Sequence, residues 1–360
     1  MHSLLAYCRP GYEADTGNEL TDIATNRNRY GYPALTPGQG YVEFHFYAEG
    51  DADALAKSVP VSDTIFPRQI VVCSAKREAI DKNDRISPIL EDVSDLCESI
   101  KAKLGNVVVE YADTEDGKVL AKFCRKFSVP LRQALRNKGL LSAKENTDKP
   151  QLHVFFTDFD SYYLGYSLPQ CRSVHVNGIC RLKFPPDAPS RSTLKLEEAI
   201  REMVHQTYQD DMFREGARAV DLGACPGGWT YQLVQRQMFV EAVDNGLIDD
   251  KLMASGLVEH YAEDGFVYKP QFGRVELLVC DMIEQPDRVT QLMGEWLVNG
   301  RTNHVIYNLK LPMKRRYETV TAARQHLLAM LEKAGIKVNI QIRHLYHDRD
   351  EVTAVVLQKL

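Results

Sequence analysis

A Gly/Pro-rich turn lies between an apolar run and a helical pattern in the second half of the chain. The apolar run covers residues 217–222, the turn covers 223–228 with the sequence Gly-Ala-Cys-Pro-Gly-Gly, and the helical pattern covers 229–237. Glycines allow the backbone to approach a ligand because they carry no Cβ atom. A strand, a turn of this composition and a helix are typical of a nucleotide or nucleoside cofactor site at the carboxyl edge of a sheet.

Ionisable side chains stand where the other predicted strands meet this edge. They are Asp244, Asp264, Asp281, Lys310 and Glu351. A single acid after a strand, such as Asp264, is more often a turn residue or a helix cap. Five groups that converge on one edge indicate a site, because ligands of such sheets bind beyond the carboxyl ends of the strands. Carboxylates suit a cofactor with ribose hydroxyls and an amine, and Asp244 is placed to accept hydrogen bonds from a ribose.

The turn itself argues against two common cofactor classes. It is not the Gly-x-Gly-x-x-Gly turn of dinucleotide sites, because Cys225 stands at the second glycine position and Pro226 precedes the glycine pair. It is not a Walker loop either, because no Lys-Ser or Lys-Thr follows the glycines. NAD and ATP are therefore disfavoured.

Strands and helices alternate after about residue 189, which predicts an α/β domain with a mainly parallel sheet and helices on both faces. A helix is expected over 193–206, with its cap within 190–192. The last two strands are too close in sequence for a crossover connection, so they must pair antiparallel. The expected strands cover 217–222, 238–243, 258–262, 275–280, 304–309, 338–345 and 352–357.

The first half has the pattern of α+β modules. A β-α-β-β-α-β order indicates a ferredoxin-like module, although only three of its four strands can be placed. In this half, strands are expected over 3–8, 40–47, 64–73, 106–111, 152–157 and 162–167, and helices over 13–25, 51–59 and 89–104. The expected organisation is a ferredoxin-like module (1–75), an RNA-binding module (76–170), a linker (171–188) and the α/β domain (189–360).

The segment from Lys118 to Lys144 is strongly basic. It carries +8 in 27 residues with no acid, whereas the chain carries −5, so the other 333 residues sum to −13. Ser128 and Pro130 predict the start of a new helix, ended by Gly139. A solvated face is the ordinary interpretation of such charges, but an acid-free run in an acidic protein favours binding to a phosphate backbone. One helix face is expected to carry Lys118, Lys122, Arg125 and Lys126, and the opposite face Val119, Leu120, Phe123 and Phe127.

The composition is that of an ordinary soluble globular protein, with 44% hydrophobic and 26% charged residues. Its eight cysteines show neither a Cys-x-x-Cys pair nor zinc-ligand spacing, so buried free thiols and no metal are expected. The start of the chain lacks a signal-peptide pattern, and no stretch approaches the length of a membrane span. A cytoplasmic protein without a membrane partner is expected.

The stretch Asp221-Leu-Gly-Ala-Cys-Pro-Gly-Gly-Trp resembles the S-adenosylmethionine loop of ribose 2′-O-methyltransferases. In those enzymes a Lys-Asp-Lys-Glu tetrad performs the chemistry, and the matching residues are Lys195, Asp281, Lys310 and Glu351. Longer stretches resemble the RlmM family of bacterial 23S rRNA (cytidine-2′-O)-methyltransferases over essentially the whole chain. They include Ala188-Pro-Ser-Arg-Ser-Thr-Leu-Lys-Leu-Glu-Glu-Ala and Asn308-Leu-Lys-Leu-Pro-Met-Lys. The basic helical segment and the strands after it also resemble the THUMP domain of RNA-modifying enzymes.

The resemblance implies a Rossmann-like methyltransferase domain that methylates a cytidine of the peptidyl-transferase loop, with Lys310 as general base. The implied partner is 23S rRNA, naked or in a pre-50S assembly particle, and a monomer is expected. The resemblance assigns contacts with S-adenosylmethionine to Ser192, Cys225, Pro226, Gly227, Gly228, Asp244, Asp264 and Asp281. Basic residues expected to contact RNA are Lys118, Lys122, Arg125, Lys126, Arg132, Arg136, Lys183, Arg191, Lys314 and Arg315.

A lysine base must lose its proton, so the pKa of Lys310 is expected to be lowered by burial and by the positive charge of Lys195. Taken singly, each lysine has an equally good structural interpretation. Lys195 could be a helix lysine whose stem extends along the core, and Lys310 could be a salt-bridged residue at a strand end. Two rival functions remain at this point. A non-catalytic rRNA-binding or ribosome-assembly protein would not need the tetrad, and a small-molecule methyltransferase would not need the basic segment.

Overall fold

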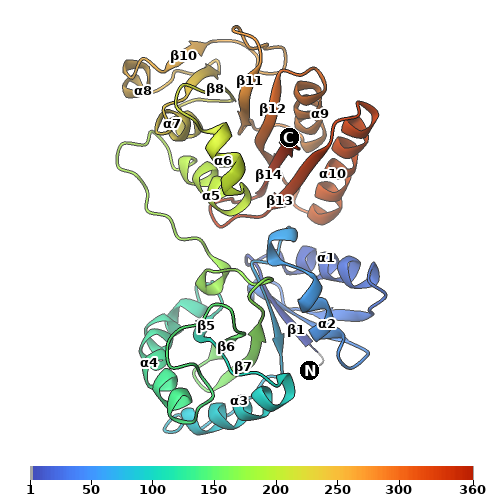
Figure 1. Cartoon of the computed structure of the whole chain (residues 1–360), viewed down its shortest axis with the longest axis vertical. Helices are drawn as coiled ribbons and strands as arrows, with labels where there is room; N and C mark the ends of the chain where they lie inside the picture. The colour runs from blue at the N-terminus through green and yellow to red at the C-terminus, as the bar shows by residue number, and fades with distance from the viewer. Residues whose placement is uncertain (1–2, 360) are drawn as a thin grey trace. The chain divides into compact units, whose positions relative to one another are not determined.

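The computed structural model describes residues 3–359 and divides the chain into two compact units, residues 1–179 and 180–360. Each unit is built around its own seven-stranded sheet (Figure 1). Within residues 3–359, no helix has both the length and the apolar character that a membrane crossing requires.

The sheet of the first unit has the strand order β2-β3-β1-β4-β7-β6-β5. Its strands are β1 (Ser3–Tyr7), β2 (Gly31–Ala34), β3 (Tyr41–Phe46), β4 (Gln69–Cys73), β5 (Asn106–Tyr111), β6 (Gln151–Asp158) and β7 (Ser161–Ser167). Its helices are α1 (Glu13–Thr25), α2 (Asp51–Ser58), α3 (Ile86–Ile100) and α4 (Ala121–Asn137). Only β5 and β6 pair in parallel.

Strands β4 and β7 join the two expected modules of this unit into one sheet, with Val72 opposite Tyr166. One hydrophobic cluster also runs through both modules and contains buried residues from all four helices. These include Leu20, Leu55, Leu96 and Leu131. Residues far apart in the sequence therefore contribute to one core, which both modules share.

The strand that could not be placed in the ferredoxin-like module is β2. It is short, contains Pro33 and lies at the edge of the sheet, where a strand tolerates a proline because its outer N–H groups need no partner. Gly31 allows its close approach to β3, since a Cβ atom there would lie 2.1 Å from the carbonyl oxygen of His45. The expected strand over 64–73 begins later, at Gln69, because the backbone N–H groups of Ile65 and Phe66 bond to the Glu19 carboxylate and not to a neighbouring strand.

The expected break at Ser128 and Pro130 is wrong, because α4 continues through both residues. Cys124, Leu131 and Leu135 are buried on one stripe that extends across Pro130, and their packing holds both halves of the helix against the sheet. The Ser128 hydroxyl bonds to the Arg125 carbonyl instead of capping a new helix. Tertiary packing thus outweighs the loss of one helical hydrogen bond.

The sheet of the second unit has the order β10-β9-β8-β11-β12-β14-β13, and its last hairpin is antiparallel as predicted. Its strands are β8 (Arg218–Leu222), β9 (Phe239–Val243), β10 (Val258–Tyr261), β11 (Val275–Cys280), β12 (Thr302–Lys310), β13 (Val338–Arg343) and β14 (Glu351–Gln358). Its helices are α5 (Thr193–Met203), α6 (Gln206–Met212), α7 (Gly228–Val234), α8 (Asp250–Ala254), α9 (Pro286–Val298) and α10 (Arg316–Lys333).

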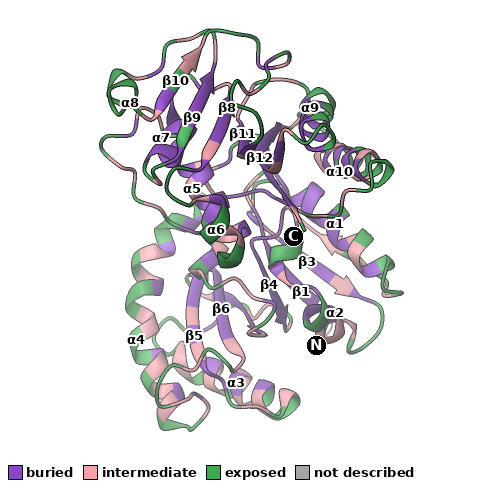
Figure 2. Ribbon diagram, turned by 45° about the horizontal axis from the view of Figure 1, so that its top comes forward, coloured by how far each residue is buried: buried purple, intermediate pink, exposed green. Residues whose placement is uncertain are grey.

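Helices cover both faces of this sheet, with α5 and α7 on one face and α9 and α10 on the other (Figure 1). The central strands are therefore largely buried, whereas the outer sides of the helices are exposed (Figure 2). The expected helix over 193–206 is α5, which ends at Met203 because Val204 is extended; α6 was not predicted, and the His205 side chain caps it. This architecture is the α/β fold predicted from the sequence.

Candidate active site

Four ionisable side chains meet at the carboxyl edge of the second sheet. Lys195 comes from α5, Asp281 directly follows β11, Lys310 ends β12 and Glu351 begins β14. The Nζ atom of Lys195 lies 3.0 Å from Oδ2 of Asp281 and 2.5 Å from Oε1 of Glu351. The Nζ atom of Lys310 lies 2.9 Å from Oδ1 of Asp281 and also contacts Glu351. Each lysine therefore touches both carboxylates, and each carboxylate touches both lysines.

Strand pairing explains half of this cluster. Strands β12 and β14 are antiparallel, and their register places Lys310 directly opposite Glu351. Side chains of directly opposed residues lie on the same face of a sheet within contact distance. The ion pair between Lys310 and Glu351 is thus a consequence of the register between β12 and β14.

Helix α5 supplies Lys195 from outside the sheet. Its residues Leu196 and Ile200 are buried in the core. The carboxylate of Glu198 accepts hydrogen bonds from the backbone N–H groups of Tyr346 and His347, at 2.9 and 2.8 Å. These contacts fasten the first turns of α5 to the core and to the loop before β14, so Lys195 is held at the carboxylates.

The lowered pKa expected for Lys310 is wrong. Burial by itself lowers the pKa of this lysine, but the charges of Asp281 and Glu351 outweigh burial and raise the pKa above its ordinary value. Burial likewise raises the pKa of Glu351, yet Lys195 and Lys310 outweigh it and lower that pKa. Both shifts favour the charged forms, so the cluster is an ion-pair network at neutral pH.

Three buried polar residues behind the cluster were missed from the sequence. The amide of Asn308 donates to Oδ1 of Asp281 at 3.1 Å, and its oxygen accepts from the Thr353 hydroxyl at 2.8 Å. The same hydroxyl lies 3.0 Å from a carboxylate oxygen of Asp348. Asn308 stands two residues before Lys310, and Thr353 two residues after Glu351. Because side chains alternate along a strand, this spacing was the available signal.

The glycine turn at residues 223–228 connects β8 to α7 at the same edge. Gly223 and Gly227 have φ angles of +78° and +114°, which side-chain-bearing residues rarely adopt. Gly228 lies against the start of α5, since a Cβ atom there would lie 2.1 Å from Oγ of Ser192 and 2.3 Å from Oγ of Ser190. Ser192 is the N-cap residue of α5, but its hydroxyl contacts Ser190 at 2.6 Å and does not cap the helix.

Asp244 and Asp264 follow β9 and β10, as predicted. The two carboxylate oxygens of Asp244 accept hydrogen bonds from the backbone N–H groups of Cys225 and Gly246, at 3.0 and 2.7 Å. Asp244 therefore connects the glycine turn to the loop after β9. Asp264 is exposed and accepts from the N–H of Phe266 at 2.9 Å.

The predicted RNA-contacting residues fall into two groups. Lys118, Arg132 and Arg136 have partners within the first unit: Lys118 pairs with Glu115, and the two arginines bond backbone carbonyls. Lys122, Arg125 and Lys126 are all exposed on α4. Val119, expected on the packed face, is 65% exposed. The four predicted residues of the second unit, Lys183, Arg191, Lys314 and Arg315, are all exposed.

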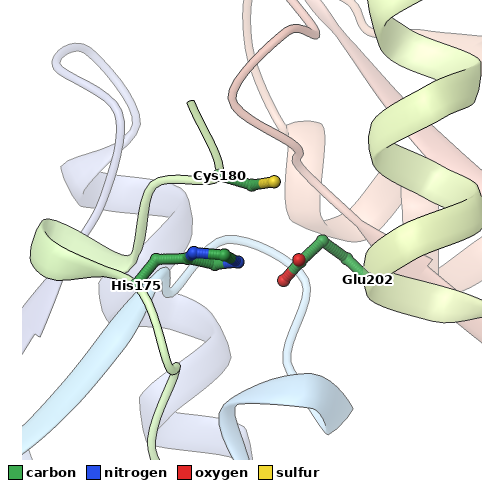
Figure 3. Close-up of side chains that lie close together, drawn as sticks. All are labelled: His175, Cys180 and Glu202. Carbon is green, nitrogen blue, oxygen red and sulfur yellow. The ribbon is translucent and has the colours of Figure 1, made fainter. Parts of the chain in front are cut away.

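Cys180 and Glu202 lie close together in the second unit (Figure 3). Burial, followed by the neighbouring charges of Glu202 and Glu198, raises the pKa of the Cys180 thiol to about 12. A thiol with so high a pKa is protonated at neutral pH and is therefore unreactive. All eight cysteines are free, and only Cys225, in the glycine turn, is exposed.

Three family models match the chain. The model described as RlmM ferredoxin-like domain matches residues 1–71. The model described as ribosomal RNA large subunit methyltransferase M, N-terminal, matches residues 84–168. The model described as FtsJ-like methyltransferase matches residues 188–321, which include the glycine turn and three residues of the four-residue cluster.

Full-length relatives agree with these models. Proteins named ribosomal RNA large subunit methyltransferase M are 55% identical in Alteromonas mediterranea and 48% identical in Vibrio parahaemolyticus. The first alignment covers 99% of this chain and 97% of the relative, and the second covers 97% of each. The relative from Haemophilus influenzae is 47% identical with all of both chains covered. This chain therefore belongs to the ribosomal RNA large subunit methyltransferase M family.

Proposed function

We propose that the protein transfers a methyl group from S-adenosylmethionine to the ribose 2′-oxygen of a cytidine in the peptidyl-transferase loop of 23S rRNA. The observation that carries the proposal is the cluster in which Lys195, Asp281, Lys310 and Glu351 alternate in charge beside the glycine turn. The name of the relatives supports ribosomal RNA of the large subunit as the substrate. The choice of a cytidine rests on the resemblance to the RlmM family.

The residues at the edge of the sheet fit S-adenosylmethionine. A carboxylate has about four acceptor positions, and the backbone uses two of those on Asp244, so the others can accept from ribose hydroxyls. The exposed carboxylate of Asp264 suits the adenine amine. The turn around Cys225, Pro226, Gly227 and Gly228, together with Ser192 and Asp281, would hold the rest of the cofactor, which supplies a methyl group on a sulfonium.

Lys310 acts as the general base in this proposal. A ribose hydroxyl is a poor nucleophile, and neutral Lys310 accepts its proton during attack on the methyl group. Before transfer, charged Lys195 and the two carboxylates give the cluster a net charge of −1, and the proton makes it neutral. Asp281 and Glu351 stabilise the resulting ammonium, and Lys195 keeps both carboxylates in place. The substrate is thus positioned and deprotonated by residues of one rigid sheet edge.

The rate of methyl transfer should rise with pH. Because Asp281 and Glu351 raise the pKa of Lys310, only a small fraction of this lysine is neutral at neutral pH. A higher pH increases that fraction, so the single-turnover rate should increase about tenfold per pH unit between pH 6.5 and 8.5. Equilibrium binding of S-adenosylmethionine over the same range is the control. A rate that is flat in pH would contradict a charged resting state of Lys310.

The exposed cations of α4 should bind the RNA backbone. Replacing Lys122, Arg125 and Lys126 together by glutamine should weaken binding and reduce the slope of log K against log salt by about two to three, because each phosphate contact contributes about 0.7 to 0.9. A matched variant replaces three exposed cations of other segments, Arg27, Lys57 and Lys333. Equal salt dependence of the two variants would exclude α4 as the RNA face.

The proposed function is tested by transfer of labelled methyl groups to 23S rRNA that lacks the modification. Naked rRNA and large-subunit assembly particles are compared as substrates, and mass mapping then locates the methyl group. A methyl group on a cytidine ribose is expected, and a methyl group on a base would refute the proposal. We further propose that the protein acts in the cytoplasm and as a monomer. Sedimentation of the purified protein would check its oligomeric state.

A further inference from the structure

Two aliphatic side chains stand out at the carboxyl edge of the second sheet. Ile283 and Met313 are 90% and 91% exposed, more than any other large hydrophobic residue that the structure describes in either unit. Single exposed apolar residues are common on protein surfaces. These two, however, lie two residues after Asp281 and three residues after Lys310.

The two residues lie in the loops that leave the ends of two neighbouring strands, one of which carries the proposed base. Strands β11 and β12 are parallel neighbours, with Cys280 opposite Tyr307. The backbone pairing ends there, and a side-chain hydrogen bond from Asn308 joins Asp281 to β12 just beyond it. Ile283 lies in the loop that follows Asp281, beside the strand that carries Lys310. The segments after β11 and β12 therefore leave the sheet next to each other.

Met282, the residue before Ile283, packs against the glycine turn. The side chain of Met282 lies against Gly223, where a Cβ atom would come within 2.7 Å of its Cγ, and against Gly265. Ile283, the next residue, is 90% exposed and therefore lies on the solvent side of this loop. Met282 thus packs against the glycine turn, where the cofactor is proposed to bind, and Ile283 faces the solvent side of the site, where the RNA would enter.

The charges next to Met313 indicate which ligand this open side receives. Lys314 and Arg315 follow Met313 directly, and both are exposed. Apolar side chains beside two free cations suit a nucleotide, because its base has an apolar face and its phosphate is an anion. If Lys310 takes the proton of a ribose, the base of that same nucleotide must lie within a few ångströms of it.

We infer that Ile283 and Met313 are positioning residues that hold the face of the target base while Lys314 and Arg315 hold an adjacent phosphate. The inference rests on the proposed function and extends it. Contact through apolar side chains orients the nucleotide without reading its hydrogen-bonding edge. The two residues therefore set how well the ribose is placed, and the identity of the base is read elsewhere.

The test uses the full-length protein and unmodified 23S rRNA. Ile283→Ala and Met313→Ala should each lower kcat/KM for rRNA by about fivefold to fiftyfold, as loss of a few methylene-sized groups from an apolar contact does. The Kd for S-adenosylmethionine and the Tm should stay unchanged, because both side chains are almost fully exposed. Met313→Leu should restore most of the activity. Val298→Ala, at an exposed position on α9, is the matched control.

Two results would overturn the inference: wild-type kinetics in both alanine variants, or a loss that is matched by an equally weakened affinity for S-adenosylmethionine. Failure of the proposed function looks different, because the wild-type protein itself would then place no methyl group on the ribose. That outcome would remove this inference as well. The inference is supported if the wild type methylates the ribose and the alanine variants lose kcat/KM for rRNA while their Kd for S-adenosylmethionine stays unchanged.

Discussion

Replacing Lys310 by alanine is expected to lower the rate of methyl transfer to rRNA by about 10²- to 10⁴-fold, the usual contribution of a general base. Lys310 is the lysine at the strand end, and its Nζ atom contacts both Asp281 and Glu351. Removal of its amine leaves the ribose hydroxyl without an acceptor for its proton. Single-turnover transfer of a labelled methyl group measures the loss, and the affinity for S-adenosylmethionine should be retained.

Lys310→Arg separates a base from a mere positive charge. Arginine keeps the charge between the two carboxylates but does not give up its proton near neutral pH, so this variant should be as inactive as the alanine variant. Lys333→Ala, at an exposed position near the end of α10, controls for the loss of a surface lysine. Activity in the arginine variant would make Lys310 an electrostatic residue, and unchanged activity in the alanine variant would exclude it from the chemistry.

Gly227→Ala is expected to weaken the binding of S-adenosylmethionine by about tenfold or more, because backbone strain and a steric clash together cost about 1–3 kcal/mol. Gly227 has a φ of +114°, and a Cβ atom there would lie 2.4 Å from Cδ1 of Leu252. An alanine therefore strains the turn between β8 and α7 and displaces the Leu252 side chain that packs against it. Equilibrium titration with S-adenosylmethionine measures the effect.

Gly216→Ala provides the control for strain alone. Gly216 also has a positive φ, of +76°, but an added Cβ atom would meet no heavy atom within 4 Å. Its substitution should lower the Tm modestly without changing the affinity for S-adenosylmethionine. If Gly227→Ala lowered the Tm but bound S-adenosylmethionine like the wild type, the glycine turn would not be the cofactor site.

The sequence predicted those features of the fold and the site that depend on residues close together in the chain. The strand over 106–111 and the helix over 13–25 have the bounds that their periodicity indicated. Asp244, Asp281 and Lys310 were found because parallel strands deliver their ends to one edge, and apolar runs mark where strands end. The motifs of the tetrad and the glycine turn also led to the family that the comparisons confirm.

Errors arose where distant residues decide the outcome. Pro130 alone indicates a helix break, but packing of Leu131 and Leu135 in the core keeps α4 continuous. Strand β2 has few sequence signals, since its pairing with β3 and its place at the sheet edge make it a strand. In both cases a tertiary contact outweighs a local preference, which periodicity does not record.

The sequence by itself determined which residues reach the site, because Lys195, Asp281, Lys310 and Glu351 stand on predictable elements in a predictable order. Only the tertiary structure decided their electrostatics. The register of β12 with β14 brings Lys310 against Glu351, and Asn308 holds Asp281 beside both lysines. A pKa depends on burial and on distances between charges that no spacing in the sequence specifies. For this reason the pKa of Lys310 is raised, where the sequence predicted a lowered one.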